Sequence, residues 1–194
     1  RSLALTTTDM DLEIVESVAA KAATTGATTV PAHTLYDIVR KLPDGSAVEI
    51  SSASGDTTLQ VKSGKSTFRL GCLSQDDFPK MGSSEKFSYS FSIPAADLRM
   101  LVDRTRFAIS NEETRYYLNG IYLHAAENDG VAVLRAVATD GHRLARFEMP
   151  LPEGARDMPG VIIPRKAINE IRKLIDEAGD TIEIGLTDNK LKFA

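Results

Sequence analysis

The segment Asp140-Gly141-His142-Arg143 holds the residue types that most suggest chemistry in this chain. A carboxylate near an imidazole can orient it as a general base, so Asp140 and His142 are candidates for acid/base catalysis. Neither a nucleophile nor a metal-ligand set accompanies them in the sequence, and Asp-Gly also makes tight turns between strands. A turn is therefore the favoured interpretation, and an acid/base enzyme is the alternative.

A second group, Arg115-Tyr116-Tyr117-Leu118-Asn119-Gly120, combines a cation with two aromatic rings. The guanidinium could contact a phosphate, and the tyrosines could stack or form hydrogen bonds. The same residues are typical of a strand start followed by a turn, and spacing alone favours that interpretation. His33 and His124 lie in unrelated contexts, and the sequence has neither a glycine-rich phosphate loop nor zincin spacing.

Three segments with helical spacing each begin at a proline, which suits the first turn of a helix. Each has an apolar stripe with basic residues outside it, usually a sign of a solvated face. Because the arrangement recurs, we expect an extended positive surface, as in proteins that follow the DNA backbone without reading bases. The segments begin at Pro31, Pro94 and Pro164; their stripes are Leu35, Ile38, Val39 and Leu42, then Leu98, Leu101, Val102 and Ile109, then Ile168, Ile171, Leu174 and Ile175; their basic residues are Arg40 and Lys41, then Arg99, Arg104 and Arg106, then Arg165, Lys166, Arg172 and Lys173.

Alternating apolar and polar residues predict strands that short turns connect. The turns, among them Ser54-Gly55-Asp56 and Asp129-Gly130, make the pairing antiparallel. Strands and helices together predict an α+β fold, in which helices cover one face of antiparallel sheets. The predicted strands span residues 48–52, 57–62, 65–71, 121–126, 131–138 and 143–149.

Much of this pattern occurs twice along the chain. Val30-Pro31, with its helix and two strands, recurs at Ile163-Pro164 with an offset of 133 residues, and Thr8-Asp9 recurs at Thr139-Asp140 with an offset of 131. Similarity at one long period implies duplicated domains. Gly82-Ser83-Ser84 interrupts the pattern and predicts a linker, which divides the chain into residues 1–84 and 85–194.

Composition fits a globular protein inside the cell. Of the 194 residues, 42% are hydrophobic and 26% charged, which excludes a disordered chain. Cys72 is the single cysteine, so an internal disulfide and a thiol-rich metal site are excluded. Apolar runs stay well short of the ~20 residues that a membrane span needs. The net charge of −4 opposes nucleic-acid binding unless basic residues cluster on one surface. The basic residues of the three predicted helices indicate such a cluster.

The motifs resemble one known family along nearly the whole chain. Arg115-Tyr116-Tyr117-Leu118-Asn119-Gly120, residues 138–145 and Ile163-Pro164-Arg165-Lys166 resemble the middle domain of bacterial DNA polymerase III beta subunits. Residues 68–73 followed by Asp77-Phe78-Pro79 resemble the end of the first domain. The resemblance implies the DNA-clamp fold, a ring of two chains with three similar domains each, in which helices line the DNA hole. Residues 1–84 would then be the C-terminal part of domain I with a linker and residues 85–194 most of domain II, without domain III.

The resemblance also implies roles for individual residues in a processivity factor that catalyses no reaction and needs no cofactor or metal. One group would face DNA and another would form part of a pocket for peptides. The implied DNA-facing residues are Arg115, Tyr116, Tyr117, Arg165 and Lys166, with Arg99 and Arg40 as weaker candidates; the implied pocket residues are Leu118, Thr139, Gly141, His142, Arg143 and Leu144.

The partners implied by the resemblance are duplex DNA, bound without sequence preference, and proteins that carry short linear motifs. These are the DNA polymerase III alpha subunit, the clamp loader and repair proteins, all in the cytoplasm. The full-length chain would form a homodimeric ring, whereas this stretch alone would neither close a ring nor hold a complete pocket. A duplicated protein-interaction module without a DNA role is the remaining alternative.

Overall fold

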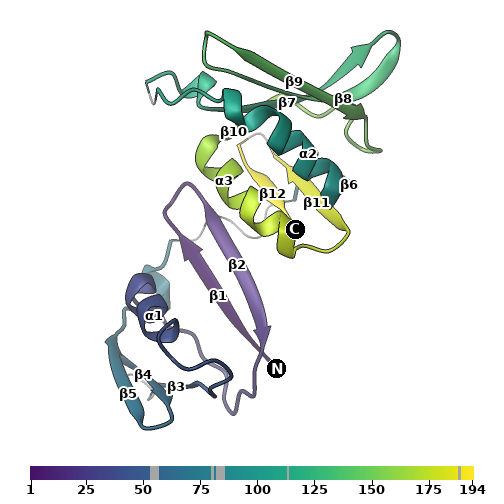
Figure 1. Cartoon of the computed structure of the whole chain (residues 1–194). Coiled ribbons are helices and arrows are strands. Elements are labelled where there is room, and N and C mark those ends of the chain that lie inside the picture. The colour runs from purple at the N-terminus through teal and green to yellow at the C-terminus, as the bar shows by residue number, and fades with distance from the viewer. Residues whose placement is uncertain (53–56, 80, 82–85, 113, 188) are drawn as a thin grey trace. The chain divides into compact units, whose positions relative to one another are not determined.

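A computed structural model of the chain describes residues 1–52, 57–79, 81, 86–112, 114–187 and 189–194. The chain divides into two compact units, unit 1 (Arg1–Ser83) and unit 2 (Ser84–Ala194). Antiparallel sheets and α-helices build both units, so the predicted α+β fold is confirmed (Figure 1). The predicted turn Ser54-Gly55-Asp56 and the predicted linker centre Gly82-Ser83-Ser84 lie outside the described residues.

Unit 1 combines a hairpin, a helix and a three-stranded meander. Helix α1 lies on one face of the β3–β4–β5 sheet, where Leu35 and Ile38 pack against a small core that includes Val61 and Leu70. The elements are β1 (Ser2–Thr8), β2 (Glu13–Ala19), α1 (Ala32–Val39), β3 (Glu49–Ser51), β4 (Thr58–Ser63), β5 (Ser66–Gly71) and the 3-10 turn η1 (Gln75–Asp77).

Unit 2 has two antiparallel sheets, with strand orders β10-β7-β8-β9 and β12-β11-β6. Helices α2 and α3 lie side by side, and one continuous core joins both helices to both sheets. Fully buried side chains such as Leu101, Leu134 and Ile184 make this core the main source of stability, since truncating one to alanine costs about 2–5 kcal/mol. The elements are β6 (Tyr89–Pro94), α2 (Ala95–Thr105), η2 (Arg106–Ala108), η3 (Tyr116–Leu118), β7 (Gly120–Asn128), β8 (Val131–Thr139), β9 (Leu144–Pro150), β10 (Val161–Pro164), α3 (Arg165–Leu174), η4 (Ile175–Glu177), β11 (Thr181–Leu186) and β12 (Leu191–Phe193).

All three proline-started helices are present, but their apolar stripes are shorter than predicted. Helix α2 ends at Thr105, whose hydroxyl donates to the Leu101 carbonyl at 2.7 Å. Ile109 is buried, yet it follows a 3-10 turn in extended backbone and does not belong to the helical stripe. Val39 and Leu174 are each 45% exposed and so lie outside their stripes as well. No helix among the described residues is long and apolar enough to cross a bilayer.

The internal repeat extends to the register of strand pairing. Thr8 pairs with Glu13 across β1 and β2, and 131 residues later Thr139 pairs with Leu144 across β8 and β9. Likewise β3–β4 and β11–β12 share one register with the offset of 133 residues, as in the pairs Ser51–Gln60 and Ile184–Phe193. Because a slip by one residue would turn every side chain to the opposite face, equal register means that equivalent residues face equivalent ways.

Candidate functional site

The turn that connects β8 to β9 is held by its own side chains. The Thr139 hydroxyl accepts the Gly141 N–H at 3.1 Å and donates to the Arg143 carbonyl at 2.7 Å. The Asp140 carboxylate accepts the N–H groups of His142 and Arg143, both at 3.0 Å, and the Arg143 Nε at 2.9 Å. Gly141 has φ +90°, a left-handed conformation that glycine adopts at little cost. The interpretation of this segment as a turn is therefore confirmed.

The bonding of Asp140 leaves it little capacity for acid/base chemistry. The backbone N–H groups of His142 and Arg143 stabilise the charged form and lower the pKa of Asp140 to about 2. The carboxylate is thus ionised throughout the physiological range, whereas a general acid or base works best with a pKa near the working pH. The geometry therefore does not favour the enzyme alternative.

A turn of the same construction occurs in unit 1 between β1 and β2. The Thr8 hydroxyl accepts the Met10 N–H at 3.0 Å, and Asp9 accepts the N–H groups of Asp11 and Leu12 at 3.1 and 3.0 Å. Met10 has φ +80° and takes the position that glycine has in unit 2. The Thr-Asp pair is therefore a structural device of both units, and the distinct chemistry of the unit 2 turn comes from its histidine and arginine.

An aromatic ring and a second arginine surround the β8–β9 turn. The Arg143 guanidinium lies over the ring of Phe107, 5.7 Å from its centroid. Arg115 Nη1 lies 3.8 Å from where a Cβ on Gly141 would be, and Arg115 Nε pairs with Glu112 at 2.9 Å. Phe107 and Glu112 are not among the site residues predicted from the sequence. In the sequence, the signal that could have identified Phe107 is an aromatic residue that lies outside the apolar stripe of the predicted helix. In the structure, Phe107 is 56% exposed.

Tyr116, Tyr117 and Leu118 form a 3-10 turn directly before β7, so the segment is a turn at the entry to a strand and not part of the strand. The Leu118 N–H donates to the Arg115 carbonyl at 2.8 Å, and β7 begins at Gly120. The two tyrosine rings meet edge to face at 5.6 Å, and 77% of Tyr116 and 55% of Tyr117 is exposed. Leu118 is half-buried, whereas Leu144, across the β8–β9 turn, is 65% exposed. This segment thus offers aromatic surface to a partner.

Arg165 joins this segment to the start of α3. Its backbone N–H donates to the Asn119 carbonyl at 2.9 Å, and its Nη2 donates to the Ile109 carbonyl at 3.0 Å. Lys166, which follows it on the helix, is exposed. The structure therefore brings Arg165 close to the Arg115–Leu118 segment, although the two are far apart in sequence. Arg115 in turn lies beside the β8–β9 turn, so the implied DNA-facing and pocket groups adjoin there.

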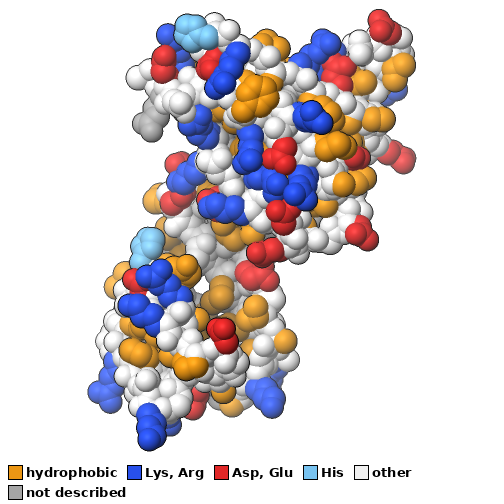
Figure 2. All heavy atoms as spheres, viewed as in Figure 1, with side chains coloured by type: hydrophobic (Ala, Val, Ile, Leu, Met, Phe, Trp, Pro, Cys, Tyr) orange, Lys and Arg blue, Asp and Glu red, His pale blue; other side chains and the backbone are white. Residues whose placement is uncertain are grey.

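The remaining implied DNA-facing residues are engaged in ion pairs. Arg99 on α2 lies 3.3 Å from Asp176 and 3.9 Å from Asp103, and Figure 2 shows acidic and basic side chains intermixed over α2 and α3. Arg40, in unit 1, pairs with Asp37 at 3.0 Å and lies over the Tyr36 ring. The positive surface expected from the helices is therefore partly neutralised by neighbouring carboxylates.

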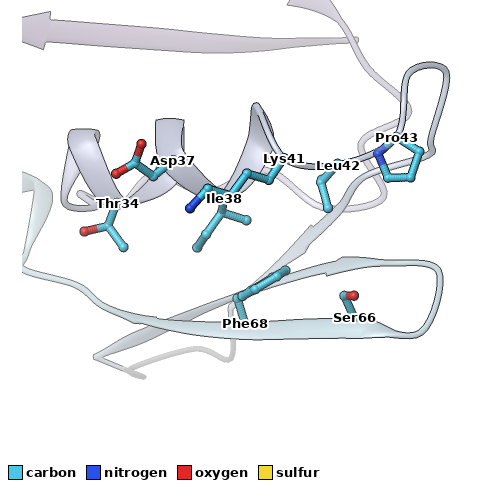
Figure 3. Close-up of a pocket in the computed structure, with 8 residues that line it drawn as sticks. All are labelled: Thr34, Asp37, Ile38, Lys41, Leu42, Pro43, Ser66 and Phe68. Atoms are coloured by element: carbon cyan, nitrogen blue, oxygen red, sulfur yellow. The ribbon is translucent and has the colours of Figure 1, made fainter.

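Unit 1 has a separate groove that the sequence analysis did not identify. It encloses about 350 Å³ between α1 and β5, and Figure 3 shows Ile38, Leu42 and Phe68 directed into it. Asp37 and Lys41 add charged groups to its lining. An apolar floor with a charged margin is typical of a protein contact.

The comparisons with known proteins agree with this geometry along both units. Residues 92–194 match the family described as DNA polymerase III beta subunit, central domain, and residues 1–82 match its N-terminal domain. The beta sliding clamp of Caulobacter vibrioides is 50% identical over 191 residues, which is 98% of this chain and 51% of the relative. That of Escherichia coli K12 is 36% identical over 194 residues, 98% of this chain and 50% of the relative. The chain thus spans about half the length of these relatives.

Solved structures give the same result for the fold. The DNA polymerase sliding clamp from Caulobacter crescentus matches with a TM-score of 0.91 and 49% identity, covering 99% of this chain and 51% of that chain. The sliding clamp from Bartonella birtlesii, solved bound to griselimycin, matches with a TM-score of 0.93 and 49% identity, covering 100% and 51%.

Proposed function

The chain belongs to the DNA polymerase III beta subunit family, and from this premise we propose that it forms part of a beta sliding clamp. Residues 1–84 would be the later part of domain I with its linker, and residues 85–194 most of domain II. Two full-length chains would close a cytoplasmic ring around duplex DNA. The ring would catalyse no reaction and would keep the polymerase on its template by enclosure.

The observation that carries the DNA role is the cluster at the start of α3. Hydrogen bonds to the Asn119 and Ile109 carbonyls hold Arg165 at the end of the 115–119 segment, which carries Arg115 and two exposed tyrosines. Cations with aromatic rings suit phosphate and sugar contacts, which position a protein on DNA without reading sequence. A ring that cannot leave sideways needs only weak contacts of this kind, and weak contacts allow sliding.

We also propose that the β8–β9 turn and its surroundings bind short linear motifs of partner proteins. Leu118 and Leu144 provide apolar surface, Gly141 permits close approach, and Arg143, supported by Phe107, provides donors. Such a site suits a peptide with an apolar anchor and polar flanks. The DNA polymerase III alpha subunit, the clamp loader and repair proteins are the partners proposed for it.

For the homodimer, we propose that the unit 1 groove takes part in the contact between two full-length chains. Its apolar side chains Ile38, Leu42 and Phe68 would gain from burial against a second copy. The chain spans about half of its relatives, so the partner surface would come from the third domain. Sedimentation of a full-length Phe68→Ser variant tests this: monomers at concentrations where the parent is dimeric support it, and unchanged dimers contradict it.

Charge reversal at the start of α3 tests the DNA role. In the full-length protein, Arg165→Glu with Lys166→Glu should strongly reduce loading onto circular DNA, because phosphate attraction becomes repulsion. A matched control reverses Arg146 and Lys192, which are exposed on outer sheet faces of unit 2. Loss of loading in the first variant alone supports the clamp. Equal loading by both variants and the parent would favour a protein-interaction module without a DNA role.

A further inference from the structure

Helices α2 and α3 are connected by an ion-pair cluster in which two carboxylates hold three arginines. Asp103 accepts Arg172 Nε at 2.8 Å and Arg106 Nε at 3.3 Å. Asp176 accepts Arg172 Nη1 at 2.9 Å and Arg99 Nη1 at 3.3 Å. Asp103 thus connects α3 with the 3-10 turn that follows α2, and Asp176 connects α3 with α2.

The cluster is mainly a surface feature. Arg172 is the best buried member, with 17% of its side chain exposed, whereas Arg99 and Asp176 are about half exposed. Its paired carboxylates stabilise the charged guanidinium and raise the pKa of Arg172 further above its usual value. Exposed ion pairs contribute little to stability, typically about 0.2–1 kcal/mol each. The cluster therefore changes the electrostatic surface more than it strengthens the fold.

We propose that Asp103 and Asp176 limit how tightly the α2–α3 face holds a phosphate backbone. This inference rests on the proposed function, in which that face lies toward DNA. The two carboxylates reduce the charge of the cluster from three to one and restrain the guanidinium groups on the helices. Asp103 and Asp176 are thus positioning residues that keep the contact weak enough for sliding.

The salt dependence of DNA binding should change when the two carboxylates are neutralised. Each cation that newly neutralises a phosphate steepens the slope of log K against log salt by about 0.9. Changing Asp103 and Asp176 to asparagine keeps the side-chain shape while freeing up to three arginines. We expect the slope to steepen by about 1–3 per chain, and affinity for a short duplex at low salt to rise roughly tenfold.

The test uses the full-length protein and a labelled linear duplex, with binding followed by anisotropy over a salt series. Asp103→Asn, Asp176→Asn and the double variant are compared with the parent. A second readout is the one-dimensional diffusion coefficient of loaded rings, which should fall in the double variant. If the more buried Asp103 proves necessary for folding, the Asp176→Asn variant alone still tests the proposal. Asp176 is 49% exposed, so its replacement should leave the fold intact.

Glu148→Gln is the matched control. Glu148 also pairs with two arginines, Arg135 and Arg146, but these lie on β8 and β9, on the sheet face opposite the core. This variant has the same charge change as either single aspartate variant, so a general charge effect would raise DNA affinity in both. Tighter binding and a steeper salt slope in the aspartate variants alone support the proposal. Equal binding by all variants, or weaker binding by the aspartate variants, overturns it.

The same experiment separates this inference from the proposed function. Reversing the charges of Arg165 and Lys166 should strongly reduce DNA loading whether or not the carboxylates matter. If that reversal has its expected effect but the aspartate variants bind like the parent, only the inference fails. If the reversal also leaves loading unchanged, the proposed DNA role fails as well.

Discussion

Replacing Gly141 with alanine separates the two requirements of the β8–β9 turn, backbone conformation and pocket shape. Gly141 has φ +90°, and a Cβ built there would have Arg115 Nη1 as its neighbour at 3.8 Å, an ordinary van der Waals distance. The substitution therefore introduces no clash. Its cost comes from placing a side chain in a left-handed conformation.

The expected cost follows from that conformation. An L-residue in the left-handed region loses about 1–2 kcal/mol, and alanine's smaller unfolded-state entropy offsets only part of it. For a unit of roughly 100 residues this corresponds to a fall in Tm of about 5–10 °C. If the turn shifts to relieve about 1 kcal/mol of strain, the proposed peptide contacts should shift too, and the affinity for the peptide should fall roughly fivefold.

Gly130 is the matched control for this experiment. It has φ +82° in the β7–β8 hairpin, and an added Cβ would have nothing within 4 Å. Thermal unfolding and anisotropy with a labelled clamp-binding peptide are measured on full-length Gly141→Ala and Gly130→Ala variants. Both should lose similar stability, but only Gly141→Ala should bind the peptide more weakly. Refutation would be an unchanged Tm for Gly141→Ala, or equal loss of peptide affinity in both variants.

Met10→Gly should stabilise unit 1 by up to about 1 kcal/mol because it removes left-handed strain in the duplicate turn; a lower unfolding midpoint would contradict this. Gly120→Ala should cost about 3 kcal/mol or more, since its Cβ would lie within 3 Å of the Ile163 carbonyl; an unchanged denaturation midpoint would sink this prediction. The pKa of the Asp140 carboxyl is lowered from 3.8 to about 2, so the contribution of Asp140 to the order of the turn is fully present above about pH 4 and is lost as the pH falls through 2. An NMR titration that follows the Asp140 side chain should therefore show no transition of that carboxyl near pH 4, and a transition there would contradict the prediction. Phe107→Ala removes the ring beneath a guanidinium and should weaken peptide binding about twofold to fivefold without changing DNA loading; equal peptide affinity would argue against that support.

The sequence was sufficient to predict elements whose signals are local. Pro31, Pro94 and Pro164 mark the starts of the helices, and the repeated Thr-Asp pair marks equivalent turns in the two units. The ends of the helices were harder to predict from the sequence. The change from α2 to a 3-10 turn at Arg106, for example, depends on tertiary packing, which leaves no local signal. Strands β1, β2, β6 and β10 were not identified, because their alternation gave no turn-bounded pattern that stood out.

The candidate site depends on contacts between distant parts of the chain, which spacing cannot give. Arg165 reaches the Ile109 carbonyl across 56 residues, and Arg172 reaches Asp103 across 69. The sequence pattern indicated basic residues on the outer faces of the helices. It did not indicate that carboxylates on the neighbouring helix would form ion pairs with them. The roles of the DNA-facing and pocket residues came from family resemblance and stay predictions.

Retention on circular against linear DNA tests enclosure most directly. The full-length protein is loaded onto a closed plasmid, the plasmid is then cut once, and the bound fraction is followed over time at fixed salt. We predict long retention on the closed circle and rapid release after the cut, because weak phosphate contacts cannot hold a ring on an open end. Equal retention on the closed and the cut plasmid would contradict the account, since binding would then reside in local contacts.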